Sequence, residues 1–233
     1  MSLYAIHNKK SRHPDTYMHY VHTYVRARII GNMKSSSSYS YIVIGLGNPG
    51  KEYEHTRHNA GRNAVLRFVK ENNLSPFEEN KKLRALASED TIEKTKIWTV
   101  LPETFMNKSG ITAKNLNIKN KKQIAESVIV VHDDLDLPIG TIKIVKNRGS
   151  AGHKGVESVM RALGTRDFTR VRIGIAKPAH IKKSQSEEIV IKTVIGKILP
   201  DDANLLKKGI KRAAEALRTI AENGVDRAMN EWN

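Results

Sequence analysis

Four short polar clusters in the chain hold side chains that could together split an ester with water: GLGNPG, TRHNAG, FMNKSG and HDDLDLP. Their polar members are Asn48, His58, Asn107 and Asp133. Histidine suits a base near neutral pH, a carboxylate holds its tautomer, and asparagine amides donate to a carbonyl oxygen that becomes negative. Such a reaction needs no protein nucleophile, in agreement with a chain that has no cysteine and no G-x-S-x-G motif.

Each of these residues alone has a structural explanation. His58 could be a structural or surface histidine, Asp133 could cap a turn before Pro138, and Asn107 could begin the helix expected after it. The combination is more informative, because each cluster lies at the end of an expected strand or in the turn after it. Side chains at such positions converge on one rim of an α/β sheet. We therefore expect the four residues to lie together.

A metal site is the first alternative. His55 and His58 have H-x-x-H spacing. Further candidate ligands crowd one strand end: His132, Asp133, Asp134 and Asp136. Alternate residues of a strand point to opposite faces, so Asp133 and its two neighbours cannot bind one ion without a bend. We expect no metal, which leaves a metal-dependent phosphoesterase or nuclease as the weaker alternative.

The loop GLGNPG also matches the G-x-G-x-x-G pattern of dinucleotide-binding proteins, through Gly45, Gly47 and Gly50. In that fold a helix begins directly after the glycines, and an acidic residue ends the next strand about 20 residues on. Here the polar segment KEYEHTRHNAG follows, and the carboxylate at that distance, Glu71, lies in an expected helix. Pro49 also removes an N–H that a phosphate could use. We expect no cofactor.

Expected strands and helices alternate along the chain, which indicates an α/β fold. Strands are expected near residues 41–46, 83–88, 96–101, 127–133, 141–146 and 170–176, and helices near 60–72, 111, 154–163 and 201–222. Because some strand pairs are separated by helices and others by short turns, we predict a single domain with a mixed, twisted β-sheet and helices on both faces. The segment AKPAHIKKSQSEE, between residues 175 and 195, is expected to be a surface loop.

Residues 1–40 differ from the rest of the chain, since they lack a clear period and end in the polar run SSSSYS. We expect a folded domain over residues 41–233, and a leader that is disordered or absent from the mature protein, with Met33 as an alternative start. The leader has no Sec-type signal, and the chain has no run of about 18 apolar residues, which favours a cytoplasmic protein without a membrane span. The scarcity of acids in the leader leaves an organellar transit peptide as the alternative.

The charge points to a polyanionic partner. The chain has a formal net charge of +16. Residues 1–40 contribute +5 of this charge, from six Lys or Arg and one Asp, and the remainder keeps +11. Such an excess attracts nucleic acid, and the binding should weaken with salt.

The clusters also occur in a recognisable order. GLGNPGKEYEHTRHNAG, PETFMNKSG, HDDLDLPIG, GSAGHKG and RVRIGIAKP together resemble the bacterial-type peptidyl-tRNA hydrolase family, from about Tyr41 through the terminal helix. The resemblance implies a monomeric enzyme that needs no cofactor and no protein partner. Its substrate would be peptidyl-tRNA, cut at the ester between the peptide and the 3′ ribose.

The resemblance also implies roles for particular residues. His58 would be the catalytic histidine that activates water, and Asp133 the carboxylate paired with it. Asn48 and Asn107 would bind the peptide main chain and help to place the water. Binding through main-chain groups would explain how one enzyme accepts any peptide sequence, because all substrates share the main chain. The peptide channel would be lined by two further residues, Tyr53 and Met106.

One position departs from the family pattern. The family commonly has Asn after the histidine of GSAGHKG, and this chain has Lys154, a cation that only donates hydrogen bonds. Lys154 is therefore predicted to contact tRNA, and a protein that binds RNA without turnover remains an alternative. A basic surface for tRNA is expected to include Lys143, Lys146, Arg148, Arg172 and Lys177.

Overall fold

The computed structural model describes residues 40–177, 187–196 and 198–233. The predicted leader lies outside these ranges, apart from Ser40. The middle of the predicted surface loop, residues 178–186, lies outside them as well.

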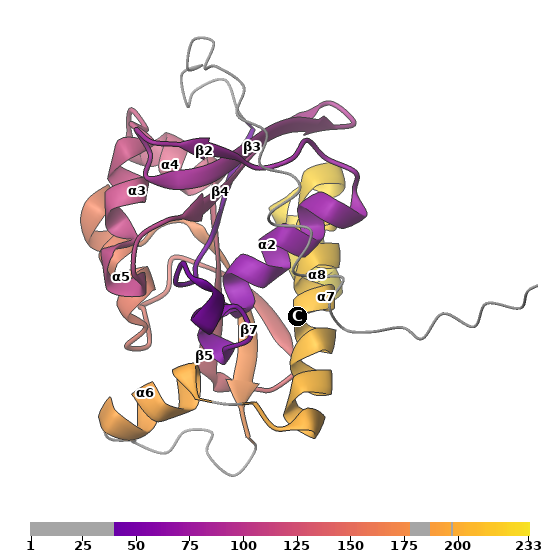
Figure 1. Ribbon diagram of the computed structural model, residues 1–233. Helices are drawn as coiled ribbons and strands as arrows, with labels where there is room; N and C mark the ends of the chain where they lie inside the picture. The colour runs from indigo at the N-terminus through magenta and orange to yellow at the C-terminus, as the bar shows by residue number, and fades with distance from the viewer. Residues whose placement is uncertain (1–39, 178–186, 197) are drawn as a thin grey trace, which may run out of the picture.

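Seven strands form one sheet within the described residues, in the order β2-β3-β4-β1-β5-β7-β6. The four central strands β4, β1, β5 and β7 are parallel to one another. At one edge β2 and β3 add antiparallel strands (Figure 1). At the other edge β6 runs antiparallel to β7. The bounds are β1 Tyr41–Gly45, β2 Glu78–Asn80, β3 Ala85–Ile92, β4 Thr95–Pro102, β5 Val128–Pro138, β6 Ile142–Lys146 and β7 Thr169–Ala176.

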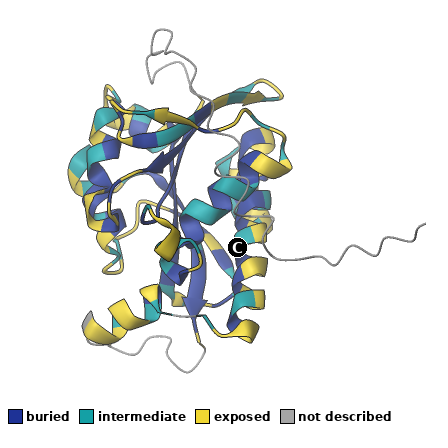
Figure 2. Ribbon diagram, viewed as in Figure 1, coloured by how far each residue is buried: buried dark blue, intermediate teal, exposed yellow. Residues whose placement is uncertain are grey.

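Helices cover both faces of this sheet (Figure 1). One face packs against α2 (Ala60–Glu71), α7 (Pro200–Asn223) and α8 (Val225–Trp232), and the other against α3 (Gly110–Asn115), α4 (Lys121–Ser127) and α5 (Lys154–Leu163). In β1, Val43 packs toward the first group of helices, whereas Ile42 and Ile44 pack toward the second. Apolar residues on both faces of a strand are typical of a sheet covered on both sides, and Figure 2 shows the central strands as buried. The predicted α/β fold, with one mixed sheet between two helical layers, is confirmed.

Four elements differ from the prediction. Helix α6 (Glu187–Ile195) occupies part of the segment expected as a surface loop, so that expectation is wrong for these residues. The apolar residues Ile189, Val190 and Ile191 are consecutive in the sequence and do not fall on one helical face, so no helical period indicated this helix. The other three, β2, α4 and α8, have only 3, 7 and 8 residues, too few for a periodic pattern to appear.

Strand β5 extends beyond the end of β1 and thereby creates the edge where the polar clusters meet. Gly45, the last residue of β1, pairs with Val131 of β5, so the next residues of β5, His132 and Asp133, have no β1 partner. The chain leaves β1 through the GLGNPG loop and forms two 3-10 turns, η3 (Lys51–Tyr53) and η4 (Arg57–Asn59), before α2 begins at Ala60. No α-helix follows the glycines directly, which agrees with the argument against a dinucleotide site.

A glycine allows α2 to approach β5 closely. A Cβ at Gly61 would overlap the carbonyl oxygen of Val131, so only glycine fits at this contact. Since η4 immediately precedes α2, the contact also sets the distance between His58 and the end of β5.

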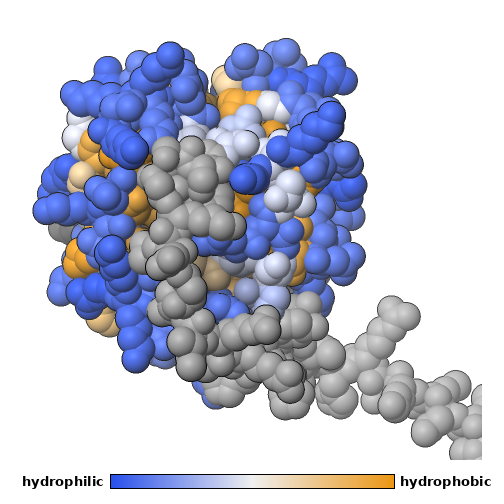
Figure 3. Space-filling model, turned by 90° about the horizontal axis from the view of Figure 1, so that it is seen from above, coloured by the Kyte–Doolittle hydropathy of each residue, from blue (hydrophilic) through white to orange (hydrophobic). Residues whose placement is uncertain are grey.

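None of the helices in the described ranges is both long and apolar enough to cross a bilayer. The coloured part of the face in Figure 3 is mostly hydrophilic, with hydrophobic residues confined to small areas.

Candidate active site

His58 and Asp133 lie in direct contact where β5 runs past β1. The imidazole Nδ1 of His58, in η4, is 3.0 Å from Oδ1 and 3.1 Å from Oδ2 of the Asp133 carboxylate. The Asp133 side chain is 2% exposed and that of His58 is 14% exposed. The structure therefore brings together the base and the carboxylate of the sequence prediction, with the carboxylate buried behind the imidazole.

A second histidine, His153, contacts the same carboxylate. Its Nε2 lies 2.9 Å from Asp133 Oδ1, while its Nδ1 accepts hydrogen bonds from the backbone N–H groups of Gly155 and Val156, each at 3.2 Å. His153 is thus the N-cap of α5. An imidazole nitrogen that accepts carries no hydrogen, so the proton of His153 is on Nε2 and is donated to Asp133. The prediction of site residues missed His153, although its position between a glycine-rich turn and a helix was a usable signal.

These contacts fix how the protons are arranged. The anionic carboxylate only accepts, so Nδ1 of His58 donates to it, and Nε2 of His58 keeps its lone pair when the ring is neutral. Burial alone would lower the pKa of His58, but the charge of Asp133 and the hydrogen bond to it raise that pKa above its ordinary value. Burial would raise the pKa of Asp133, but His58 and His153 hold that pKa well below its ordinary value. The pair is therefore an ionised carboxylate and a histidine whose pKa is raised above its ordinary value.

His58, Asp133 and His153 also offer three ligand atoms within 4.8 Å of one another, a spacing that could suit a metal ion. The hydrogen bonds do not fit this use, because a metal needs an imidazole nitrogen without hydrogen. The nitrogens that face Asp133 carry hydrogens, and the other nitrogen of His153 is occupied by backbone amides. The sequence had also suggested His132 and Asp134 as metal ligands. Both side chains lie on the other side of the strand from the contact between Asp133 and His58, where His132 approaches Arg170 and Asp134 pairs with Arg172.

Asn48 is held beside this cluster by a neighbouring asparagine. The side chain of Asn59 accepts from the Asn48 N–H at 2.8 Å and donates to the Asn48 carbonyl at 2.9 Å, which ties the GLGNPG loop to η4. The side-chain oxygen of Asn48 accepts from the Met106 N–H at 2.7 Å. Among the described residues no acceptor is found for its Nδ2 amide, so that group can donate to a substrate. Asn59 was not predicted.

The other predicted substrate-binding residues lie around Asn48 in different environments. Asn107 is exposed in the 3-10 turn η5 (Met106–Lys108). Tyr53 is half-buried, with its ring edge-on to Phe105 at a centroid distance of 6.4 Å. Met106 is only 4% exposed and packs in the core beside α5, so it supports the site from behind more than it lines an open channel.

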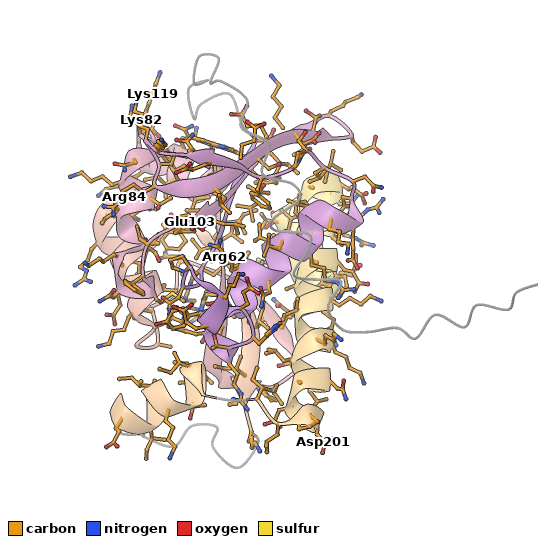
Figure 4. All side chains as sticks on the ribbon, viewed as in Figure 1. Arg62, Lys82, Arg84, Glu103, Lys119 and Asp201 are labelled. Carbon is orange, nitrogen blue, oxygen red and sulfur yellow. The ribbon has the colours of Figure 1, made fainter. Side chains whose placement is uncertain are left out.

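Two arginines anchor the segment that carries His58. Arg62, on α2, donates to the Pro102 carbonyl at 3.0 Å and pairs with Glu103, the residue after β4. Figure 4 labels the side chains of Arg62 and Glu103. Arg57, next to His58, pairs with Asp202 in the first turn of α7 at 2.9 Å, and both side chains are nearly buried. Arg57 also donates to the Thr193 carbonyl of α6 at 3.3 Å.

The predicted tRNA-binding residues divide into two groups. Lys143, Lys146, Arg148 and Lys154 are exposed, and Lys154 directly follows His153 as the first residue of α5. The other two form ion pairs within the protein: Arg172 donates to Asp134 at 2.6 Å, and Lys177 lies 3.3 Å from Asp202. Arg172 is 16% exposed, so it is a poorer candidate for tRNA contact than the sequence suggested. Arg172 points to the opposite face of β7 from Val171 and Ile173, and it lies opposite Lys143 in the ladder of β6 and β7.

The chain is similar to known proteins in both sequence and structure. A family model described as "Peptidyl-tRNA hydrolase" matches residues 42–233. The chain is 38% identical over 193 residues to "Peptidyl-tRNA hydrolase" of Thermodesulfovibrio yellowstonii, which covers 82% of this chain and 98% of the relative. It is likewise 38% identical over 193 residues to the protein of that name from Caldanaerobacter subterraneus subsp. tengcongensis, covering 83% of this chain and 99% of the relative. The crystal structure of peptidyl-tRNA hydrolase from Acinetobacter baumannii superposes with a TM-score of 0.74 at 30% identity, covering 87% of this chain and 97% of that chain.

Proposed function

The chain belongs to the peptidyl-tRNA hydrolase family, and we propose that it cleaves the ester of peptidyl-tRNA with a water molecule activated by His58. The observation that supports this role is the contact of His58 with the buried Asp133 carboxylate, 3.0 Å away. That contact leaves the opposite nitrogen, Nε2, as the base. Residues 41–233 are proposed as the hydrolase domain, acting as a cytoplasmic monomer, with an organellar protein as the alternative if residues 1–40 are a transit peptide.

The proposed reaction has two steps. Nε2 of His58 removes a proton from water while the water oxygen bonds to the ester carbonyl carbon, which forms a tetrahedral oxyanion. The oxyanion then collapses, the bond to the 3′ oxygen of the ribose breaks, and that oxygen takes the proton from His58. Asp133 stabilises the imidazolium that exists between the two steps, and His153 holds Asp133 in place. The products are tRNA with a free 3′ hydroxyl and a peptide with a free carboxyl group.

Asn48 is proposed to bind the peptide main chain. Its oxygen is engaged by the Met106 N–H, so its Nδ2 amide is directed to substrate, either to a peptide carbonyl or to the developing oxyanion. The exposed Asn107 would add a second amide from the neighbouring turn. Neither amide contacts a side chain of the peptide, which suits an enzyme that accepts peptides of any sequence.

The tRNA is proposed to lie along the exposed cations Lys143, Lys146, Arg148 and Lys154. Cations near phosphates give affinity without sequence selectivity, as a substrate class of many tRNAs requires. Lys154 would contact the tRNA close to the ester, because it adjoins His153.

The experiment is hydrolysis of N-blocked aminoacyl-tRNA by the purified chain in EDTA. Release of the acyl group is expected, and His58→Ala should lower the rate by about 100-fold or more. His55→Ala serves as a matched control, since His55 is exposed in the same segment and has no part in the proposed reaction. Binding of tRNA without turnover by the parent protein would favour the RNA-binding alternative. Activity that is lost with EDTA and restored by a divalent metal would favour a metal-dependent hydrolase.

A further inference from the structure

Two buried polar side chains lie behind Asp133 and have no part in the proposed proton transfer. His132 has no exposed surface, and Arg170 on β7 is 1% exposed. Burying a histidine and an arginine costs free energy unless their polar atoms are hydrogen-bonded, so the partners of these two side chains are informative. Their contacts lead to the two residues that meet at the site, Asp133 and His153.

His132 holds the main chain of Asp133. Its Nδ1 lies 2.6 Å from the Asp133 carbonyl oxygen, which can only accept, so Nδ1 carries the hydrogen. Burial and the neighbouring His153 and Arg170 lower the pKa of His132 to about 3, against the opposing effect of Asp134 and Asp133, so the ring is neutral at pH 7. The lone pair is then on Nε2, which faces Nη1 of Arg170 at 3.5 Å.

Arg170 connects this ring to the segment that carries His153. Its Nη2 donates to the Gly149 carbonyl at 2.7 Å, four residues before His153. Its Nε is buried, with no hydrogen-bond partner among the described residues. The guanidinium is therefore oriented by the Gly149 carbonyl and the His132 ring at the cost of one unsatisfied N–H.

His132 also contacts His153 directly. The two rings are edge-on, with centroids 4.8 Å apart. His153 is thus fixed by its own backbone N-cap contacts, by the ring of His132 and, through Gly149, by Arg170.

We infer that His132 and Arg170 are positioning residues, which hold the Asp133 main chain and the segment leading to His153 so that one carboxylate oxygen meets both His58 and His153. The inference rests on the proposed function of His58. Neither residue touches the substrate, so their loss should lower kcat and leave KM unchanged. A rotated Asp133 would also stabilise the protonated form of His58 less.

Two amide substitutions of His132 test the inference as a matched pair. In His132→Asn the side-chain amide occupies the place of Nδ1 and can still donate to the Asp133 carbonyl. In His132→Gln the amide occupies the place of Nε2, so that donor is removed while the contact to Arg170 is kept. The two variants have the same functional group, and the difference between them reports the hydrogen bond to Asp133.

The measurements are kcat and KM on N-blocked aminoacyl-tRNA, the pKa of His58 from its Cε1–H NMR signal, and thermal unfolding as a check on folding. His132→Gln should lower kcat by about tenfold or more, the scale found when an outer hydrogen-bond partner is removed, and should shift the His58 pKa down. His132→Asn should stay within about threefold of the parent kcat. Arg170→Lys should resemble His132→Gln, because an ammonium group cannot span both the Gly149 carbonyl and the His132 ring.

Equal loss of kcat in the Asn and Gln variants would overturn the inference, since it would show that the site needs the shape of the ring and not its hydrogen bond. A folded His132→Gln variant with the parental kcat and the parental His58 pKa would overturn the inference too. Parental activity in Arg170→Lys would show that Arg170 is not a positioning residue. The NMR titration needs no turnover. An inactive parent protein would therefore count against the proposed function, while the pKa difference between the Asn and Gln variants would still decide the role of His132.

Discussion

His58 donates through Nδ1 to Asp133, whose carboxylate oxygens lie 3.0 and 3.1 Å away. Asp133 belongs to β5, and His58 to a 3-10 turn that α2 holds against β5. His153 approaches the same oxygen from α5, on the other face of the sheet. The carboxylate therefore links the two helical layers, and both helix starts must be correctly placed for the site to form.

The first prediction concerns the charge of Asp133. Asp133→Asn should lower kcat by about 100-fold or more, because the amide no longer stabilises the imidazolium and can hold the wrong tautomer of His58. The pKa of His58 should fall, since the charge that raises it is removed. Asp136→Asn is the control, because Asp136 is exposed in the same motif. An Asp133→Asn protein with an unchanged His58 titration would show that the contact is not formed in solution.

The second prediction concerns the approach of α2 to β5. Gly61→Ala should push the start of α2 away from the Val131 carbonyl, at a cost of about 1–3 kcal/mol in the free energy of unfolding. A displacement of about 1 Å at His58 should also lower kcat by up to about 100-fold. Ala64→Gly is the control, since it destabilises the same helix without a clash, by about 1 kcal/mol in helix propensity together with the loss of a buried methyl group. Comparable reductions of activity in both variants, measured on the folded fraction, would contradict the positional role of Gly61.

The third prediction separates the two functions of Asn48. Asn48→Asp keeps an oxygen for the Met106 N–H but replaces the Nδ2 donor with a negative charge. It should unfold near the parental temperature and lower kcat/KM by about 100-fold or more, the scale for removal of an oxyanion donor. Asn48→Ala should also reduce stability, by about 1–3 kcal/mol, because the buried Met106 N–H no longer has its acceptor. If Asn48→Asp keeps parental kcat/KM, the amide does not contact the substrate.

The fourth prediction concerns tRNA affinity. KM for N-blocked aminoacyl-tRNA should rise with salt, because cations of the protein replace counterions of the phosphates. On a plot of log KM against log salt concentration, the double variant Lys143→Gln, Lys146→Gln should have a smaller slope than the parent. The slope should fall by about 0.7–0.9 for each phosphate that the variant no longer neutralises. The matched control is Lys208→Gln, an exposed lysine of α7. Equal slopes in the parent and the double variant would place the tRNA elsewhere on the surface.

Much of the fold was predictable, because the apolar strands of the sheet are bounded by glycine and polar turns and are separated by periodic helices. Helix α6 was not, since three of its apolar residues are consecutive and give no helical period. In the site, His58 and Asp133 were recognisable by residue type and by their place after strands. The place of His153 between a glycine-rich turn and a helix was a local signal for an N-cap, but its contact with Asp133 depends on how the start of α5 approaches β5 from the other face. The ion pair of Arg172 with Asp134 likewise depends on the neighbouring strand, so the sequence alone indicated a surface cation at Arg172.

The central claim is that neutral His58 is the base, and the pH dependence of turnover tests it most directly. The protonated ring cannot accept a proton, so kcat/KM should rise with pH through the pKa of His58, which Asp133 places above the ordinary 6.5. We predict that the midpoint of log kcat/KM against pH coincides with the NMR titration midpoint of the His58 Cε1–H signal, and that both move down together in Asp133→Asn. A rate that stays flat from about pH 5 to 8, or a midpoint that does not follow the His58 titration, would contradict the account.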